Sequence, residues 1–196
     1  MKRALLLVAV LSTFAAAAAK REASQAPDPE AMTKAWQAFA SPNANHEKLA
    51  KMAGNWTTKT TFWAAPGAPP QESEGTAELQ MILGGRYLEQ RHHGSLMGQP
   101  FEGLGYTGYD NLKRKYVTTW MDNFGTSILV MTGSLDASGK VLRSQGTMDE
   151  IMTGKPQKLK DAVTLVDDDH FTYDLWTADP KGRLAKTMEI AYTRAK

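Results

Sequence analysis

From Gly54 to the end of the chain the sequence shows no helical period and instead contains ten runs whose side chains alternate with a period of two. Such alternation is typical of β-strands. The expected strands cover approximately residues 55–63, 75–83, 87–94, 99–107, 115–122, 127–135, 140–151, 157–166, 170–178 and 183–194. Turn residues separate them, and no intervening segment is long enough for a crossover helix. The sequence therefore predicts an all-β domain, an antiparallel up-and-down barrel of about ten strands, because closure removes the exposed edges of such a sheet.

Residues 1–19 have the pattern of a secretory signal peptide. Lys2 and Arg3 give a positive start, an apolar run follows, and Ala17-x-Ala19 is a cleavage motif. The run is too short and too rich in alanine to span a membrane comfortably. We therefore expect cleavage before Lys20 and a periplasmic or secreted protein with no transmembrane segment after cleavage. An uncleaved anchor is the alternative.

Composition limits the chemistry of the exported form. The chain has no cysteine, which excludes both a disulfide and a lipid-modified N-terminal cysteine. Removing Lys2 and Arg3 with the signal peptide leaves 21 basic and 21 acidic residues. A neutral domain with interspersed charges lacks the basic surface that nucleic acid requires, so we expect no nucleic-acid partner. Four scattered histidines predict no metal site.

Between the signal peptide and the barrel, residues 20–45 form a leader with one short amphipathic helix. Asp28 can cap this helix, and Pro29 suits its first position. Apolar side chains then recur at helical spacing, at Met32, Trp36 and Phe39. A second short helix, at 46–53, opens the barrel domain, which we place at residues 46–196.

The two ends of the expected barrel resemble those of the calycin superfamily, which includes lipocalins and fatty-acid-binding proteins. Gly54-x-Trp56 follows a short helix at the start of the first strand, and Arg194 ends the last strand. In calycins a tryptophan of this kind closes the barrel floor, and a basic residue from the last strand packs across it. Trp56 and Arg194 resemble that pair, and a guanidinium stacked on an indole would also gain cation–π energy.

A more specific resemblance involves four glycine-rich segments in the middle of the chain. They are Gly84-Gly85-Arg86-Tyr87-Leu88, Met97-Gly98-x-Pro100-Phe101-x-Gly103, Gly105-x-x-Gly108-Tyr109-Asp110 and Trp120-x-Asp122-x-x-Gly125-Thr126. Together they resemble the bacterial family called domain of unknown function 1579, from about His46 to the C-terminus. The resemblance implies a calycin-like barrel, often exported, that is related in shape to nitrobindin-like haem-binding barrels. It implies no established activity and no catalytic residues.

Strand alternation restricts which side chains can share a cavity. Adjacent residues face opposite sides of a strand, so His92 and His93 cannot both point inward. If the face with Arg91 and His93 is inside, the cavity gains a cation and an imidazole, and we take these two as candidate ligand-binding residues. If the face with Gln90 and His92 is inside, the cavity is less charged.

Four further side chains are candidates for ligand binding, each with a structural alternative. Trp120 could line a pocket, or it could be ordinary core while Asp122 caps the following turn. Met148 belongs to a set of methionines that could form an adaptable lining or could fill gaps in the core. Arg143 and Glu189, if buried, would need a partner or a ligand group, and the alternative is a solvated position on the outer surface.

These observations favour an exported protein that holds a small, mostly apolar molecule, such as a lipid fragment, an isoprenoid or a tetrapyrrole, in its barrel. The likeness to nitrobindin-like barrels adds a haem hypothesis, with His92 or His93 as the axial ligand. The alternatives are a cavity-based isomerase, cyclase or hydratase that uses the charged candidates, and an envelope scaffolding protein that docks through its N-terminal helix. No catalytic motif supports the enzymatic alternative, and the sequence does not indicate an oligomeric state.

Overall fold

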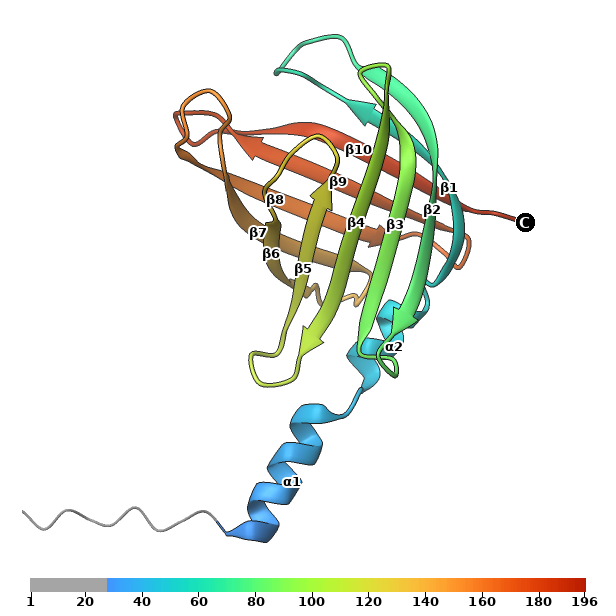
Figure 1. Cartoon of the computed structure of the whole chain (residues 1–196), viewed down its shortest axis with the longest axis vertical. Helices are drawn as coiled ribbons and strands as arrows, with labels where there is room; N and C mark the ends of the chain where they lie inside the picture. Colours follow the sequence, from blue (N-terminus) through green and yellow to red (C-terminus); the bar gives the residue numbers. More distant parts are fainter. Residues whose placement is uncertain (1–27) are drawn as a thin grey trace, which may run out of the picture.

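The computed structural model describes residues 28–196 as two helices followed by a closed barrel of antiparallel strands (Figure 1). The predicted signal peptide and the leader up to residue 27 lie outside the described residues. The helices are α1 (Pro29–Ala40) and α2 (Ala44–Ala50). The strands are β1 (Gly54–Phe62), β2 (Gln71–Ile82), β3 (Tyr87–Leu96), β4 (Gln99–Asp110), β5 (Lys115–Asp122), β6 (Leu129–Leu135), β7 (Val141–Asp149), β8 (Pro156–Leu165), β9 (His170–Ala178) and β10 (Leu184–Arg194).

Each strand pairs with its neighbours in sequence, and β1 pairs with β10 to close the barrel. The predicted fold class, a ten-strand antiparallel barrel preceded by short helices, is confirmed. The expected bounds of β5 and β9 coincide with the observed ones. β2 begins four residues earlier than expected. Its first part, Gln71–Glu74, is polar and largely exposed on both faces, so it lacks the alternation by which the rest of the strand was predicted.

Helix α1 extends away from the barrel (Figure 1). The Asp28 carboxylate caps it by accepting a hydrogen bond from the Glu30 N–H, but none of its residues is buried. It is tied to the barrel at its C-terminal end, where the Asn111 side chain donates to the carbonyls of Ala38, Phe39 and Ser41. Within residues 28–196, neither helix is both long and apolar enough to cross a bilayer.

Helix α2 covers one end of the barrel. Asn43 and His46 form a capping box at its start, so that His46 is buried there. Leu49 points into the barrel end, and the last turn leads directly into β1. The carbonyl of Met52 accepts a hydrogen bond from Trp56 Nε1 at 3.0 Å, which holds the indole across the opening.

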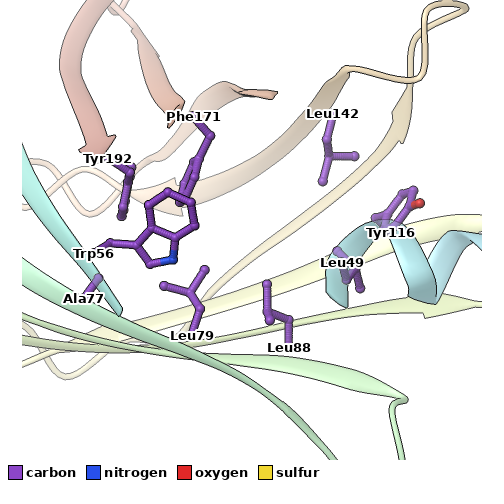
Figure 2. Close-up of a cluster of buried hydrophobic side chains, with 9 residues drawn as sticks. All are labelled: Leu49, Trp56, Ala77, Leu79, Leu88, Tyr116, Leu142, Phe171 and Tyr192. Carbon is purple, nitrogen blue, oxygen red and sulfur yellow. The ribbon is translucent and has the colours of Figure 1, made fainter. Parts of the chain in front are cut away.

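The main hydrophobic core lies at this same end and closes it (Figure 2). Trp56 meets Phe171 edge to face with 4.7 Å between ring centroids, and Phe171 stacks on Tyr192 at 4.0 Å. The nine buried members of the cluster are Leu49, Trp56, Ala77, Leu79, Leu88, Tyr116, Leu142, Phe171 and Tyr192. They come from α2 and from strands all around the barrel, so they form a packed floor.

Beneath the floor, Arg194 seals the junction between the first and last strands. Its guanidinium lies 4.2 Å from the centroid of the Trp56 ring, and the two residues are direct partners in the β1–β10 ladder. The same guanidinium donates to the carbonyls of Lys51, Ala53 and Asp168. This is the stacked arrangement expected from the sequence.

Candidate functional site

The cross-strand register shows which side chains face the lumen. Trp56 faces inward at the floor, so alternate residues of β1 such as Thr58 and Thr60 also face inward. Carrying this alternation through the pairings of β2 and β3 places Gln90 and His92 on the inner face. Of the two alternatives for β3, the structure therefore has the less charged face inside.

Arg91 and His93 lie on the outer wall, which corrects the expectation that they line the cavity. Both side chains border a shallow hollow of about 310 Å³ beside Thr57 and Glu78 on the outer surface. Arg91 contacts the Glu89 carboxylate at 2.9 Å, and its side chain is half exposed. Charged side chains stay hydrated in this position, whereas inside the barrel they would have to be desolvated.

Arg143 and Glu189 also lie outside. Arg143 is exposed and borders an open hollow of about 820 Å³, whose lining also includes Lys115, Lys160 and Asp161. Glu189 accepts a hydrogen bond from Lys186 Nζ at 2.8 Å on the outer face of β10. The four charges that motivated the enzymatic alternative therefore do not converge around the lumen.

Trp120 and Met148 do face the lumen. Trp120 pairs with Gly105 across the β4–β5 ladder, and its ring lies against the backbone of Gly103 and Gly105. Met148 pairs with Gln157 on the inner side of β7 and β8. The other methionines divide: Met81, Met131 and Met188 face inward, while Met97 and Met152 are exposed outside the lumen.

An aromatic wall surrounds Trp120 toward the open end of the barrel. Phe101 stacks on Trp120 at 6.4 Å and contacts Phe124 at 5.7 Å. The Asp122 carboxylate accepts one hydrogen bond from Trp120 Nε1 and one from the Phe124 backbone N–H, each at 3.0 Å. Asp122 thus caps the turn, as one alternative expected, and also orients the indole.

His92 is a buried imidazole on the inner face, with 5% of its surface exposed. Its Nε2 lies 3.1 Å from Thr58 Oγ1, and its ring meets Phe101 edge to face. Nδ1 is buried without a hydrogen-bond partner in the described part of the chain. Burial, and to a smaller degree the charge of His93, lower the pKa of His92 to about 4, so the ring is neutral at neutral pH.

This geometry does not fit the haem hypothesis. His93 faces outward, the Nε2 of His92 is in contact with Thr58, and its Nδ1 is enclosed. Neither histidine therefore presents a free nitrogen to the lumen. A metal site formed by protein side chains finds no support either, because no three His, Asp or Glu side chains gather closely enough within residues 28–196.

Asp161, which our sequence reasoning missed, is the second buried titratable group on the inner face. The residue is 6% exposed, and its carboxylate accepts a hydrogen bond from the Ser144 N–H at 3.1 Å. Burial raises the pKa of Asp161 to about 6, against hydrogen bonds from Ser144 that lower it. The signal was present in the sequence, because Asp161 alternates with Leu159 and Val163 and is thus a single acid on an apolar strand face.

Two inward-facing tyrosines, Tyr173 and Tyr192, lie toward the floor from Asp161. Burial, and to a lesser degree the negative charge of Asp161, raise the pKa of Tyr173 on β9. Tyr192 on β10 accepts a hydrogen bond from Gln90 Nε2 at 3.0 Å, and burial raises the pKa of Tyr192 to about 12. Asp161, Tyr173 and Gln90 therefore add polar groups next to the floor, and the hydroxyl of the floor residue Tyr192 joins them through Gln90.

Above the floor the lumen remains accessible to water. Trp56, Leu79 and Phe171 are almost completely buried. In contrast, several inward-facing residues of the upper wall keep intermediate exposure, namely Thr60, Gln90, Trp120, Met148, Tyr173, Leu175, Met188 and Ile190. Tyr173 is surrounded by protein and still keeps this exposure, so it borders an internal space. We call the space that these partly exposed residues line above the floor the upper chamber.

Comparison with solved structures shows similarity to other barrels. The crystal structure of Rv2717c from M. tuberculosis has a TM-score of 0.59 and 15% sequence identity, covering 80% of this chain and 100% of that chain. A de novo designed fluorescence-activating β-barrel has a TM-score of 0.42 and 14% identity, covering 74% of this chain and 94% of that chain. At these identities, the likeness to Rv2717c shows the fold alone.

Comparison of the sequence identifies the family. A search of curated proteins finds no significant match. The model of one protein family, described as "Protein of unknown function (DUF1579)", matches residues 41–194. The matched region contains α2 and the whole barrel with its floor. The chain therefore belongs to the DUF1579 family, as the resemblance of its glycine-rich segments predicted.

Proposed function

We propose that this protein binds a small, mostly apolar molecule in the upper chamber of its barrel, after export to the periplasm or beyond the cell. The observation that carries the proposal is the contrast between the packed floor and the partly exposed inner wall above it. Ligand sites in barrel mouths are typically concave, mostly apolar and supplied with a few placed polar groups. The chamber has this composition.

The inner wall supplies apolar surface from several sides. Trp120 and Phe101 contribute aromatic area from β5 and β4, and Met188 and Leu175 contribute flexible and branched aliphatic groups from β10 and β9. Methionine adapts to irregular shapes, and aromatic rings bury large areas with few rotatable bonds. Such a wall suits a ligand with an extended apolar body.

The test is native mass spectrometry of the protein purified from its own cell envelope, followed by denaturation to release and weigh any bound molecule. A matched pair of variants locates the site. Thr60→Trp fills the chamber from its inner wall, whereas Thr57→Trp places the same ring on the exposed outer face of the same strand. We expect a reproducible ligand mass that survives Thr57→Trp and disappears in Thr60→Trp.

Two results would contradict the proposal. One is equal ligand retention in both variants, which would place the ligand outside the chamber. The other is a protein that carries no small molecule and whose tryptophan emission does not respond saturably to any added amphiphile.

Export is tested by sequencing the N-terminus of the protein recovered from the envelope fraction and from the medium. Cleavage after Ala19 would leave Lys20 as the first residue. Full-length protein confined to the cytosol would contradict this part of the proposal.

A second candidate function is scaffolding within the envelope, supported by the exposed apolar side chains of α1. Trp36 is 66% exposed and contacts only Phe39 among the described aromatic residues. A photocrosslinking residue at position 36, compared with one at position 34 on the opposite side of the helix, tests this role in intact cells. A product specific to position 36 supports scaffolding, and identical patterns at both positions oppose it.

A further inference from the structure

The inner wall also indicates the charge of the ligand. We propose that the chamber binds an amphipathic cation, an apolar molecule that carries a protonated amine or a quaternary ammonium group. This inference rests on the proposed function and narrows it to a ligand class.

The charges of the inner face have one sign. Within the ten described strands, the inward-facing positions include two carboxyl groups, Asp122 and Asp161. The single basic side chain in this register is Arg194, which lies beneath Trp56 and donates to backbone carbonyls at the closed end. No other Lys or Arg of the ten described strands occupies an inward-facing position.

Asp161 lies on the inner face of β8, opposite Ser144 on β7 and Leu175 on β9. Its carboxylate is almost fully buried, and its hydrogen bonds come from Ser144 alone. A buried carboxylate without a counter-charge is unfavourable, and an opposite charge placed beside it recovers part of the lost hydration. The nearby Tyr173 hydroxyl has no hydrogen-bond partner in the described part of the chain and adds a second acceptor for a ligand N–H.

The second carboxyl group, Asp122, lies beside the aromatic wall. The Trp120 ring lies against Gly103 and Gly105 and keeps intermediate exposure on the inner side of β5. Phe101 and Phe124 extend the aromatic surface next to it. A carboxylate combined with aromatic faces is the environment that stabilises ammonium groups through charge pairing and cation–π contact.

The same inner face is unfavourable for an anionic amphiphile. A carboxylate headgroup in the chamber would lie near Asp122 or Asp161 with no Lys or Arg to pair with it, and like charges in a partly desolvated site repel strongly. The basic side chains of this half of the barrel, such as Lys115, Arg143 and Lys160, occupy outward-facing positions of their strands and border the same hollow of about 820 Å³ as Asp161. The arrangement therefore selects against fatty acids.

The experiment uses four ligands with the same twelve-carbon chain: dodecylammonium, dodecyltrimethylammonium, dodecanol and dodecanoate, each below its critical micelle concentration. Binding to the purified protein at neutral pH is measured by calorimetry and by tryptophan emission. We expect saturable binding of both cations at least about tenfold tighter than that of dodecanol, and weaker binding of dodecanoate than of dodecanol. Thr60→Trp should abolish the binding of the cations.

Isosteric variants locate the charge effect. Asp161→Asn and Asp122→Asn each remove one negative charge and should weaken binding of the cations by about tenfold or more, with little change for dodecanol. The control is Asp174→Asn, which removes a carboxylate from the outer face of β9, where it pairs with Lys186. A loss in Asp174→Asn equal to that in the inner variants would overturn the inference.

A pH series gives an independent readout. Dodecyltrimethylammonium keeps its charge, so its affinity should fall as pH is lowered through about 6, the pKa of Asp161, and this fall should be absent in Asp161→Asn. The other titratable groups on the inner face are His92, Asp122 and the phenols of Tyr109, Tyr116, Tyr173 and Tyr192. His92 stays neutral over this interval because its pKa is about 4.

The possible failures are distinguishable. If none of the four ligands binds saturably, both the proposed function and the cation inference fail. If dodecanol or dodecanoate binds as tightly as the cations, the apolar chamber is supported and the cation inference is overturned.

Discussion

The indole of Trp120 lies in the space that Gly103 leaves by having no side chain. A Cβ added at Gly103 would be 2.1 Å from Trp120 Cζ2, closer than any packed pair of carbon atoms. Gly105, two residues along the same strand, supports the other part of the ring in the same way. The position of the aromatic wall therefore depends on two glycines in the neighbouring strand.

This relationship predicts that Gly103→Ala displaces Trp120. We expect a loss of about 1–3 kcal/mol in the free energy of unfolding, together with a shift in tryptophan emission, because overpacking forces the ring away from its rotamer. Urea denaturation followed by fluorescence measures both. Gly125→Ala is the control, because a Cβ there has nothing within 4 Å; similar losses for both variants would contradict the packing argument.

The seal beneath the floor predicts a large effect for Arg194→Ala. The change removes the cation–π contact with Trp56 and leaves the carbonyls of Lys51, Ala53 and Asp168 without their donor. We expect a loss of about 2–4 kcal/mol in denaturant unfolding. Arg183→Ala, in an exposed turn pair with Asp179, should change stability by less than about 0.5 kcal/mol. Equal effects would show that Arg194 is not a seal.

The two tryptophans near the N-terminal end of the described chain predict opposite outcomes. Trp56→Ala removes the centre of the floor and should cost about 3–5 kcal/mol of folding free energy. Trp36→Ala, on the projecting helix, should leave thermal unfolding almost unchanged because α1 buries no side chain. A clear loss of stability in Trp36→Ala would mean that α1 packs on the barrel in solution.

His92 predicts acid destabilisation. Its folded-state pKa of about 4 is below the ordinary value of 6.5, so the unfolded chain binds the proton more tightly and folding stability falls as pH drops from 6.5 to 4. The contribution is about 3 kcal/mol by the linkage relation. In His92→Gln this contribution is lost, so urea unfolding between pH 7 and 4.5 should show a stability that rises relative to the wild type as the pH is lowered.

Asp161 predicts the opposite slope. Its folded-state pKa of about 6 is above the ordinary value of 3.8, so the native state holds the proton more tightly and folding stability rises as pH drops from 6 to 3.8. The size is again about 3 kcal/mol. In the wild type the contributions of His92 and Asp161 to the pH dependence of folding stability should nearly cancel. Asp161→Asn removes one of them, so this variant should show the acid destabilisation due to His92. A profile for Asp161→Asn that is no steeper than the wild-type profile would contradict this account.

The ten strands, their order and the closure by Trp56 and Arg194 could be predicted because they depend on local patterns and on a recognisable sequence resemblance. The inner face of β3 could not be chosen in the same way. Its two faces both contain polar groups, and only the pairing with β2 places His92 inside and His93 outside. A desolvation argument alone would have favoured this answer, since it keeps Arg91 in water.

The remaining site features depend on contacts between strands. The fit of Trp120 on Gly103 is set by the register of β4 against β5, which no single strand encodes. Asp161 is different, because an isolated acid on an apolar strand face is visible in the sequence. Sequence reasoning missed it by weighing histidines and clustered charges above a single acid.

The pairing of β1 with β10 also has a kinetic consequence. The hydrogen bond from Arg194 to the Ala53 carbonyl joins residues 141 positions apart in the chain. Contacts at such separation carry a high loop-closure cost and form late, so barrel closure should limit the folding rate. The seam would then be the last part of the wall to form and the first to open, and weakening it should mainly accelerate unfolding.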